Sequence, residues 1–209
     1  MSVVAVVAEV KAAQAFLKAI GASPTNTDLI YAVVSWMRQE SGSLKNVVGN
    51  NPFNLRPGKD IDEKLIAGIR KSGNGRFLIF KSLEDGLIAT AQRLLRAGND
   101  WRGYGLVVRA LRHGSSLDFI TAISLSAWDA AHYGYKAPDV TTSHIYRIYA
   151  TFTGLQLPKP EDPKTKKRPD PVRPRDLNAP IVVRDYIDAH EARRMFLARH
   201  KSDGVLPND

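Results

Sequence analysis

A single glutamate, Glu40, stands where an acid could transfer a proton. The apolar stripe before it has the spacing of one helix face and consists of Ile30, Val33, Val34 and Met37. Three more residues bring the same face to Glu40, so we expect this carboxyl at the wall of the core, near the end of its helix. Apolar surroundings and the negative helix end both disfavour the ionised form. A carboxyl that holds its proton near neutral pH can act as a general acid.

The plainer interpretation of Glu40 is a solvated residue at a helix end, paired with Arg38 or Lys45. Periodicity alone favours it, because most acids in such places carry out no chemistry. The next segment, GNNPFNLRPG at 49–58, changes the balance. Its asparagine amides donate and accept hydrogen bonds, which suits sugar hydroxyls and N-acetyl groups. Ordinary turn chemistry around Pro52 is the alternative for Asn51 and Asn54.

A second candidate segment, SAWDAAHYGY at 126–135, concentrates aromatic residues. It reads as core followed by a helix end, or as a cleft wall where Trp128 stacks on a sugar ring and a tyrosine hydroxyl holds an acetamido group. Of the two tyrosines we favour Tyr133 over Tyr135 for this role. The five histidines show no metal-ligand spacing, so we expect no metal and no cofactor.

Several elements must position these residues. A helix is expected over 2–20, stopped by Gly21 and Pro24, and a second from an N-cap at Asn26 or Thr27 to a stop at Gly42. Two β-prone runs around KSGNG, within 65–82, predict a hairpin. The remaining helices are expected at 83–97, 106–113, 117–133 and 143–152. The predicted fold class is therefore α+β, mainly α, with one small β-hairpin.

Composition and charge restrict the partners. The chain has 209 residues, no cysteine and a net charge of +9, which excludes a disulfide framework and favours polyanionic partners such as an acidic cell wall, an anionic lipid surface or nucleic acid. No apolar run approaches a membrane span, and the first ten residues read poorly as a signal peptide.

Proline divides the chain. Residues 158–180 contain seven prolines and seven lysines or arginines, a composition typical of an extended basic linker. We therefore expect a catalytic domain at 1–157, the linker at 158–180, and a C-terminal helix and tail at 181–209. An isolated helix is marginal in water, so 181–200 is expected to dock on a partner, with a frayed solubilising tail as the alternative.

Four segments in order carry a family resemblance: WMRQESG, NNPFNLRPG followed by the hairpin, FKSLEDGLIATAQRLL, and AISLSAWDAAHYGY. Together they resemble the lysozyme-like superfamily of goose-type lysozymes and soluble lytic transglycosylases, most closely the peptidoglycan-cleaving modules of actinobacterial bacteriophages. The resemblance spans about 16–135. It implies that Glu40 is the catalytic acid and that the predicted substrate-binding residues line a cleft; these are Ser41, Asn51, Asn54, Phe80, Trp128 and Tyr133.

The resemblance also implies cleavage of the β-1,4 bond between N-acetylmuramic acid and N-acetylglucosamine. A hydrolase needs a second carboxylate at about 5 to 9.5 Å, whereas a lytic transglycosylase uses the 6-hydroxyl of the sugar and returns Glu40 as a base. No acid stands in a recognisable motif, which favours the second route. The available acids are Asp60, Asp62, Glu63, Glu84, Asp85 and Asp129.

The expected protein is thus a phage-type peptidoglycan-degrading enzyme, built into a virion tail and held there by other virion proteins through 181–200. Its localisation could instead be the host cytoplasm, before release to the wall. A non-catalytic structural virion protein of the same fold is the alternative from another class. We expect peptidoglycan as the main partner and nucleic acid to be an unlikely one.

Overall fold

The computed structural model describes residues 3–73, 75–96, 102–128 and 132–155. The chain divides into two compact units, Met1–Leu157 and Pro158–Asp209. All described residues belong to the first unit, Met1–Leu157. The predicted linker at 158–180 and the predicted docking helix at 181–200 lie outside the described residues.

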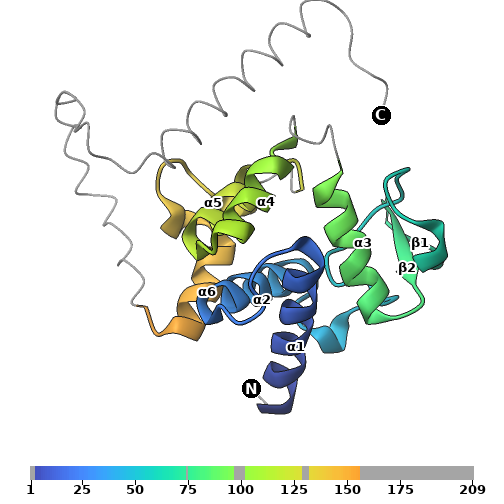
Figure 1. Ribbon diagram of the computed structural model, residues 1–209, viewed down its shortest axis with the longest axis horizontal. Coiled ribbons are helices and arrows are strands. Elements are labelled where there is room, and N and C mark those ends of the chain that lie inside the picture. Colours follow the sequence, from blue (N-terminus) through green and yellow to red (C-terminus); the bar gives the residue numbers. More distant parts are fainter. Residues whose placement is uncertain (1–2, 74, 97–101, 129–131, 156–209) are drawn as a thin grey trace, which may run out of the picture. The chain divides into compact units, whose positions relative to one another are not determined.

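Helices dominate the first unit, and one small antiparallel sheet stands beside them (Figure 1). This agrees with the predicted mainly helical α+β class. Among the described residues, the α-helices are α1 (Val3–Ile20), α2 (Thr27–Ser41), α3 (Leu83–Leu95), α4 (Tyr104–His113), α5 (Ser116–Leu125) and α6 (His144–Thr153). The strands are β1 (Ile66–Ser72) and β2 (Gly75–Phe80). The short 3-10 turns are η1 (Leu44–Asn46), η2 (Glu63–Leu65), η4 (His132–Gly134) and η5 (Val140–Thr142).

Helix α2 begins and ends where the sequence predicts. The side chain of Asn26 accepts a hydrogen bond from Leu29 N at 3.1 Å and so caps the first turn. Gly42 stops the helix with φ 78°, and its N–H donates to Arg38 O at 2.8 Å. These two caps fix the length of α2, which leaves Glu40 in the last turn, one residue before the helix ends.

The hairpin and the loop before it form one layer. Phe77 of β2 is opposite Arg70 of β1 in the antiparallel register. On the other edge of β2, Leu78 N donates to Leu55 O at 2.9 Å and Phe80 N donates to Gly49 O at 2.8 Å. The asparagine-rich loop is therefore hydrogen-bonded to β2, and it reaches from the hairpin to the end of α2.

The core has two parts. Around the fully buried Trp36, rings of Phe16, Phe53 and Phe119 pack at centroid distances of 4.0 to 5.9 Å. A smaller apolar cluster lies under the hairpin and comprises Leu55, Ile61, Leu78, Phe80 and Ala89. Trp128 packs against both parts, because its ring is 5.1 Å from that of Trp36 and it also contacts the smaller cluster.

The predicted helix at 117–133 is wrong in its second half, since α5 ends at Leu125. Ser126 Oγ donates to Ile123 O at 2.8 Å and accepts from Trp128 N at 3.2 Å, and Ala127 N donates to Arg102 O instead of continuing the helix. A serine side chain that bonds nearby backbone groups competes with helical hydrogen bonds. The apolar periodicity of 117–125 carries no sign of this local competition.

Candidate acid site at the end of helix α2

Glu40 is partly buried, and its carboxylate accepts hydrogen bonds at both oxygens. The Tyr133 hydroxyl donates to Oε1, and Asn54 Nδ2 lies 3.4 Å from Oε2. Asn54 Nδ2 also donates to the Glu40 carbonyl oxygen at 2.6 Å. Three separate segments, the end of α2, the loop at 49–58 and the turn η4, therefore meet at one carboxylate.

Tyr133 reaches Glu40 because of an unusual backbone conformation. Its φ is +49° and its ψ is +33°, a left-handed geometry that a bulky residue seldom adopts. Tyr133 is only 5% exposed. Trp36 Nε1 donates to its hydroxyl oxygen at 3.3 Å, and the hydroxyl donates in turn to Glu40, so the three residues form a chain of hydrogen bonds that ends at the Glu40 carboxylate. The indole N–H contact orients the phenol so that its own proton points to Glu40.

Asn54 takes a left-handed conformation as well, with φ 52°. Asparagine tolerates this region better than other side chains. Asn51 has a different task in the same loop, because it is 1% exposed and its amide is used internally. Its Nδ2 donates to Leu55 O and Leu78 O, and its Oδ1 accepts from Leu55 N at 2.7 Å. Asn51 thus holds the loop to β2, while Asn54 contacts the acid.

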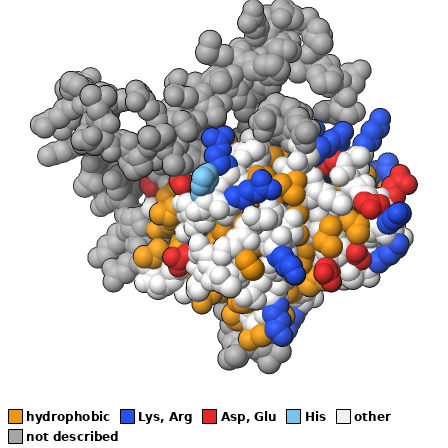
Figure 2. Space-filling view, viewed as in Figure 1, with side chains coloured by type: hydrophobic (Ala, Val, Ile, Leu, Met, Phe, Trp, Pro, Cys, Tyr) orange, Lys and Arg blue, Asp and Glu red, His pale blue; other side chains and the backbone are white. Residues whose placement is uncertain are grey.

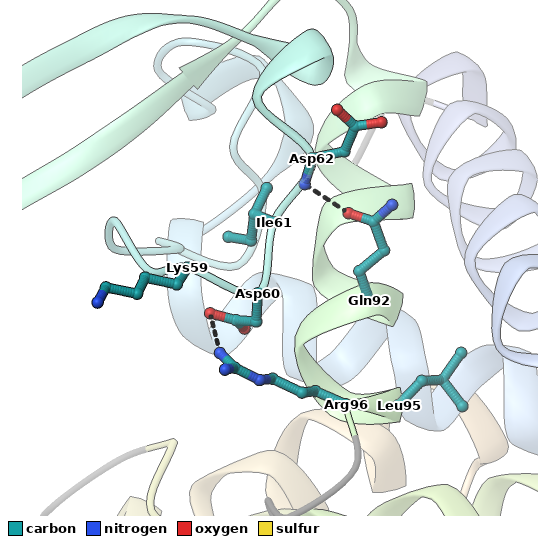
Figure 3. A pocket seen from close by; sticks show the side chains of 7 residues that line it. All are labelled: Lys59, Asp60, Ile61, Asp62, Gln92, Leu95 and Arg96. Carbon is teal, nitrogen blue, oxygen red and sulfur yellow. Dashed lines mark hydrogen bonds and ion pairs between the residues drawn. The ribbon is translucent and has the colours of Figure 1, made fainter.

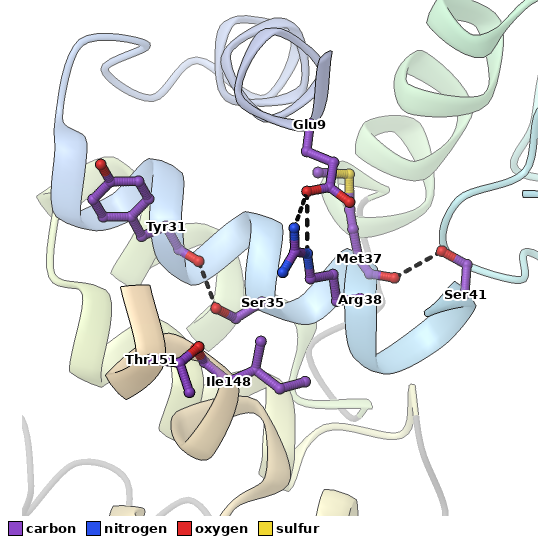
Figure 4. A network of polar contacts seen from close by, with 8 residues as sticks. All are labelled: Glu9, Tyr31, Ser35, Met37, Arg38, Ser41, Ile148 and Thr151. Carbon is purple, nitrogen blue, oxygen red and sulfur yellow. Dashed lines mark hydrogen bonds and ion pairs between the residues drawn. The ribbon is translucent and has the colours of Figure 1, made fainter. Parts of the chain in front are cut away.

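Arg38, one of the two residues that could pair with Glu40 at a solvated helix end, forms an ion pair with another acid. Arg38 binds Glu9 of α1, with its Nε at 3.1 Å and an Nη at 2.5 Å from Oε2 (Figure 4). The guanidinium also lies 4.6 Å from the ring centroid of Phe152. Arg38 therefore ties α2 to α1 and α6. Lys45, the other offered partner, is exposed in η1.

Of the other predicted substrate-binding residues, one is buried in the core and two are half-buried. Phe80 is 1% exposed and belongs to the core under the hairpin. Ser41 is half-buried, and its hydroxyl donates back to Met37 O at 2.8 Å, as Figure 4 shows. Trp128 is also half-buried, beside Trp36 and Tyr104. Of the predicted set, Asn54 and Tyr133 contact Glu40, whereas Asn51 and Phe80 support the fold around it.

Three of the six acids considered as a second carboxylate have structural partners. Asp60 is paired with Arg93 and, at 3.6 Å, with Arg96. Asp62 caps η2 by accepting from Lys64 N at 2.9 Å. Asp85 accepts from the Ser82 hydroxyl at 2.7 Å in a cap of α3. Glu63 and Glu84 are exposed in the first turns of η2 and α3, and Asp129 lies outside the described residues.

An open hollow of about 500 Å³ lies next to the Asp60 pair, between the loop at 59–62 and the end of α3 (Figure 3). Gln92 closes one side by accepting from Asp62 N at 3.1 Å. The walls are Lys59, Asp60, Ile61, Asp62, Gln92, Leu95 and Arg96. Glu40 is not among them, so the hollow is a feature separate from the acid site.

No group of three or more histidines, aspartates or glutamates that could hold a metal is present among the described residues. Tyr135, the tyrosine that we did not favour, is half-buried, and burial, together with the nearby Asp139 carboxylate, raises its phenol pKa. In the described part of the chain, no helix is long and apolar enough to cross a membrane.

Sequence reasoning missed the partner of Arg38 and the way in which Tyr133 is held. Glu9 could have been suspected, because an acid inside an otherwise apolar helix face usually requires a partner. The Trp36 to Tyr133 contact joins residues 97 positions apart, and no local pattern encodes it. Comparisons with protein-family models, with curated proteins and with solved structures give no match for this chain.

Chemically, the arrangement offers a partly accessible carboxyl between a phenol and an amide. Tyr133 and Asn54 are neutral hydrogen-bonding groups, which can stay in place while the carboxyl gains or loses a proton. Glu9, in contrast, is bound by the guanidinium of Arg38. Glu40 is thus the better placed of the two acids for proton transfer.

Proposed function

We propose that this protein cleaves a glycan, with Glu40 as the general acid. The observation that carries the proposal is the contact of Glu40 with Tyr133 and Asn54. Side-chain chemistry and the family resemblance also indicate both residues as site residues. Proton transfer by a positioned carboxyl is worth about 10² to 10⁴ in rate.

The proposed reaction begins with Glu40 protonated. Its Oε2 has the longer hydrogen bond, 3.4 Å to Asn54 Nδ2, so this oxygen is the better candidate to carry the proton. Glu40 gives that proton to the glycosidic oxygen as the bond to the anomeric carbon breaks. Tyr133 stabilises the carboxylate that forms by donating to Oε1.

For the second half we favour the lytic transglycosylase route. The 6-hydroxyl of the sugar attacks the anomeric carbon, and its proton returns to Glu40, which leaves a 1,6-anhydro sugar and the original acid. The structural partners of Asp60, Asp62 and Asp85 support this choice, because these carboxylates already serve in an ion pair and two caps. A hydrolase would need one of the available acids as a nucleophile or as a base for water.

We propose peptidoglycan as the substrate, with cleavage between N-acetylmuramic acid and N-acetylglucosamine, and a lysozyme-like fold for the first unit. The support is the resemblance of the four segments together with the small hairpin and loop beside the acid. Delivery from a virion tail through 181–200 belongs to the same proposal. Truncation after Leu157 should then keep cleavage of soluble peptidoglycan fragments and abolish incorporation into particles.

The direct experiment is loss of turbidity of a purified peptidoglycan suspension. Wild-type protein should clear it, and Glu40→Gln should not. Glu84→Gln is the matched control, since Glu84 is an exposed glutamate in the first turn of α3, and it should clear the suspension at the wild-type rate. Failure of folded wild-type protein to clear peptidoglycan would refute the proposal.

One observation favours a structural alternative. The Glu40 carboxylate and carbonyl together fasten the loop at 49–58 and the turn η4 to α2, a role that needs no substrate. A virion protein could retain the fold for this reason alone. In that case the wild-type protein would cleave no glycan, and Glu40→Gln would only lower its thermal stability.

A further inference from the structure

Two arginines enclose one phenylalanine on the hairpin. The guanidinium carbon of Arg70 lies 4.9 Å from the ring centroid of Phe77, and that of Arg56 lies 5.6 Å from it. We call Arg56, Phe77 and Arg70 the arginine row. The register places Arg70 of β1 opposite Phe77 of β2. On the other edge of β2, the bond from Leu78 N to Leu55 O brings the next loop residue, Arg56, beside the ring.

These two arginines differ from the arginines of the core ion pairs. Arg38 is neutralised by Glu9 and Arg93 by Asp60. Within the described ranges, neither Arg56 nor Arg70 has a carboxylate within ion-pair distance, and Arg70 Nε is buried without a hydrogen-bond partner. Arg56 is exposed and Arg70 half-buried. The ring holds two charged, planar donor groups in place while their charge stays uncompensated.

The arginine row is connected to the acid site by the loop at 54–56. Asn54, which contacts Glu40, is two residues before Arg56. Basic side chains, with acidic ones among them, gather where the hairpin lies in Figure 1 (Figure 2). On the opposite face of the hairpin, Lys71 and Arg76 form a cross-strand pair of exposed cations, away from the Phe77 ring.

We infer that Arg56, Phe77 and Arg70 form a binding surface for the carboxylates of an acidic glycan that extends from the Glu40 site. The inference rests on the proposed function. Planar guanidinium groups bind carboxylates in bidentate fashion, and stacking on Phe77 fixes their orientation before the ligand arrives. Continuity with the Glu40 loop favours a glycan over nucleic acid as the ligand.

The test measures co-sedimentation of the full chain with insoluble peptidoglycan, in a Glu40→Gln background so that the substrate stays intact. The variant is Arg56→Gln/Arg70→Gln. The matched control is Lys71→Gln/Arg76→Gln, which removes two charges from the opposite face of the same hairpin. Peptidoglycan with its carboxyl groups amidated, neutral chitin and duplex DNA are the further ligands. Thermal midpoints check folding, and the two single arginine variants replace the double variant if it unfolds.

The arginine variant should bind native peptidoglycan at least about tenfold more weakly, since a charged hydrogen bond is worth about 1.5 to 3 kcal/mol and 1.4 kcal/mol is a factor of ten. The control should stay within about threefold, since scattered surface charges contribute little. Amidated peptidoglycan should bind the parent protein as weakly as native peptidoglycan binds the arginine variant, and chitin should not distinguish the variants.

Equal loss in both double variants would overturn the inference, because net charge alone would then explain binding. A selective loss of DNA binding, with peptidoglycan unaffected, would also overturn it. If the arginines govern peptidoglycan binding but wild-type protein releases no muropeptides, the proposed cleavage fails and the binding surface stands. If wild-type protein cleaves and the arginines are irrelevant, the surface alone fails.

Discussion

Two glutamates, one in helix α2 and one bound to it, have contrasting surroundings. Glu9 of α1 is 1% exposed and is bound by the guanidinium of Arg38. Glu40, two residues beyond Arg38, is partly exposed and accepts hydrogen bonds from a phenol and an amide. Glu9 joins α1 to α2 through an ion pair. Glu40 accepts the last hydrogen bond of the chain that runs from Trp36 through Tyr133.

The difference teaches how the same side chain acquires two roles. A buried carboxylate that loses its cationic partner is left as an uncompensated charge, so the ion pair is part of the fold. A partly exposed carboxyl that accepts hydrogen bonds from a phenol and an amide can exchange a proton with a substrate that reaches it. Substitutions at the two sites should therefore separate stability from activity.

The largest expected effect is on activity at Glu40. Glu40→Gln keeps the shape and an acceptor for Tyr133 but cannot supply the proton, so cleavage should fall by about 10² to 10⁴. The thermal midpoint should stay close to that of the wild type. A folded variant that keeps more than a tenth of the activity would contradict the acid role.

The largest expected effect on stability is at the other acid. Arg38→Met leaves Glu9 buried without its cation, which should lower the free energy of unfolding by about 3 to 5 kcal/mol. Denaturant titration measures it. The double variant Glu9→Leu/Arg38→Met should recover much of the loss, since an apolar pair can replace a buried ion pair. A double variant as unstable as the single one would show that packing, not charge, dominates here.

A smaller and mixed effect is expected at Tyr133. Tyr133→Phe removes the donor to Oε1, so the acidic form of Glu40 should persist to higher pH and the pH profile of cleavage should move upward. It also leaves the buried Trp36 N–H without its acceptor, at a cost of about 1 to 3 kcal/mol. Tyr135→Phe is the matched control and should leave the pH profile unchanged. If the pH profile of cleavage is unchanged in Tyr133→Phe, the Tyr133 hydroxyl has no part in proton transfer.

The smallest effect is expected at Asn54. Asn54→Gly removes the amide and its bond to Glu40 O but keeps the left-handed backbone, so activity should fall several-fold and stability by about 0.5 to 1.5 kcal/mol. Asn54→Ala removes the same amide but strains the backbone at about 1 kcal/mol or more, and it should be the less stable of the two. Equal stability of the two variants would show that the loop adjusts its backbone.

Much of the framework was predictable from local signals. Asn26 and Gly42 define α2 through capping chemistry, and the β-prone runs around KSGNG give the hairpin. The sequence predicts Tyr133 as a substrate contact and does not predict its contact with Glu40, because that contact depends on the early end of α5 at Leu125 and on the positive φ of Tyr133. Side-chain competition at Ser126 is a local effect and the positive φ of Tyr133 is held by tertiary contacts, and apolar periodicity encodes neither.

The asparagine loop shows the same limit at finer scale. Its amide chemistry indicated sugar contacts for Asn51 and Asn54 alike, yet the fold uses Asn51 for the hydrogen bonds between loop and strand. Phe80 likewise packs into the core under the hairpin. Residue type predicted that these side chains would form specific contacts, and only the arrangement of the loop on β2 decided which contacts.

The most direct measurement is mass spectrometry of the muropeptides released from purified peptidoglycan by wild-type protein and by Glu40→Gln. The account predicts 1,6-anhydro muropeptides from the wild type and none from the variant. Reducing-end products would contradict the transglycosylase route. Release by folded Glu40→Gln at the wild-type rate, or no release by the wild type, would contradict the central claim that Glu40 is the acid of a glycan-cleaving site.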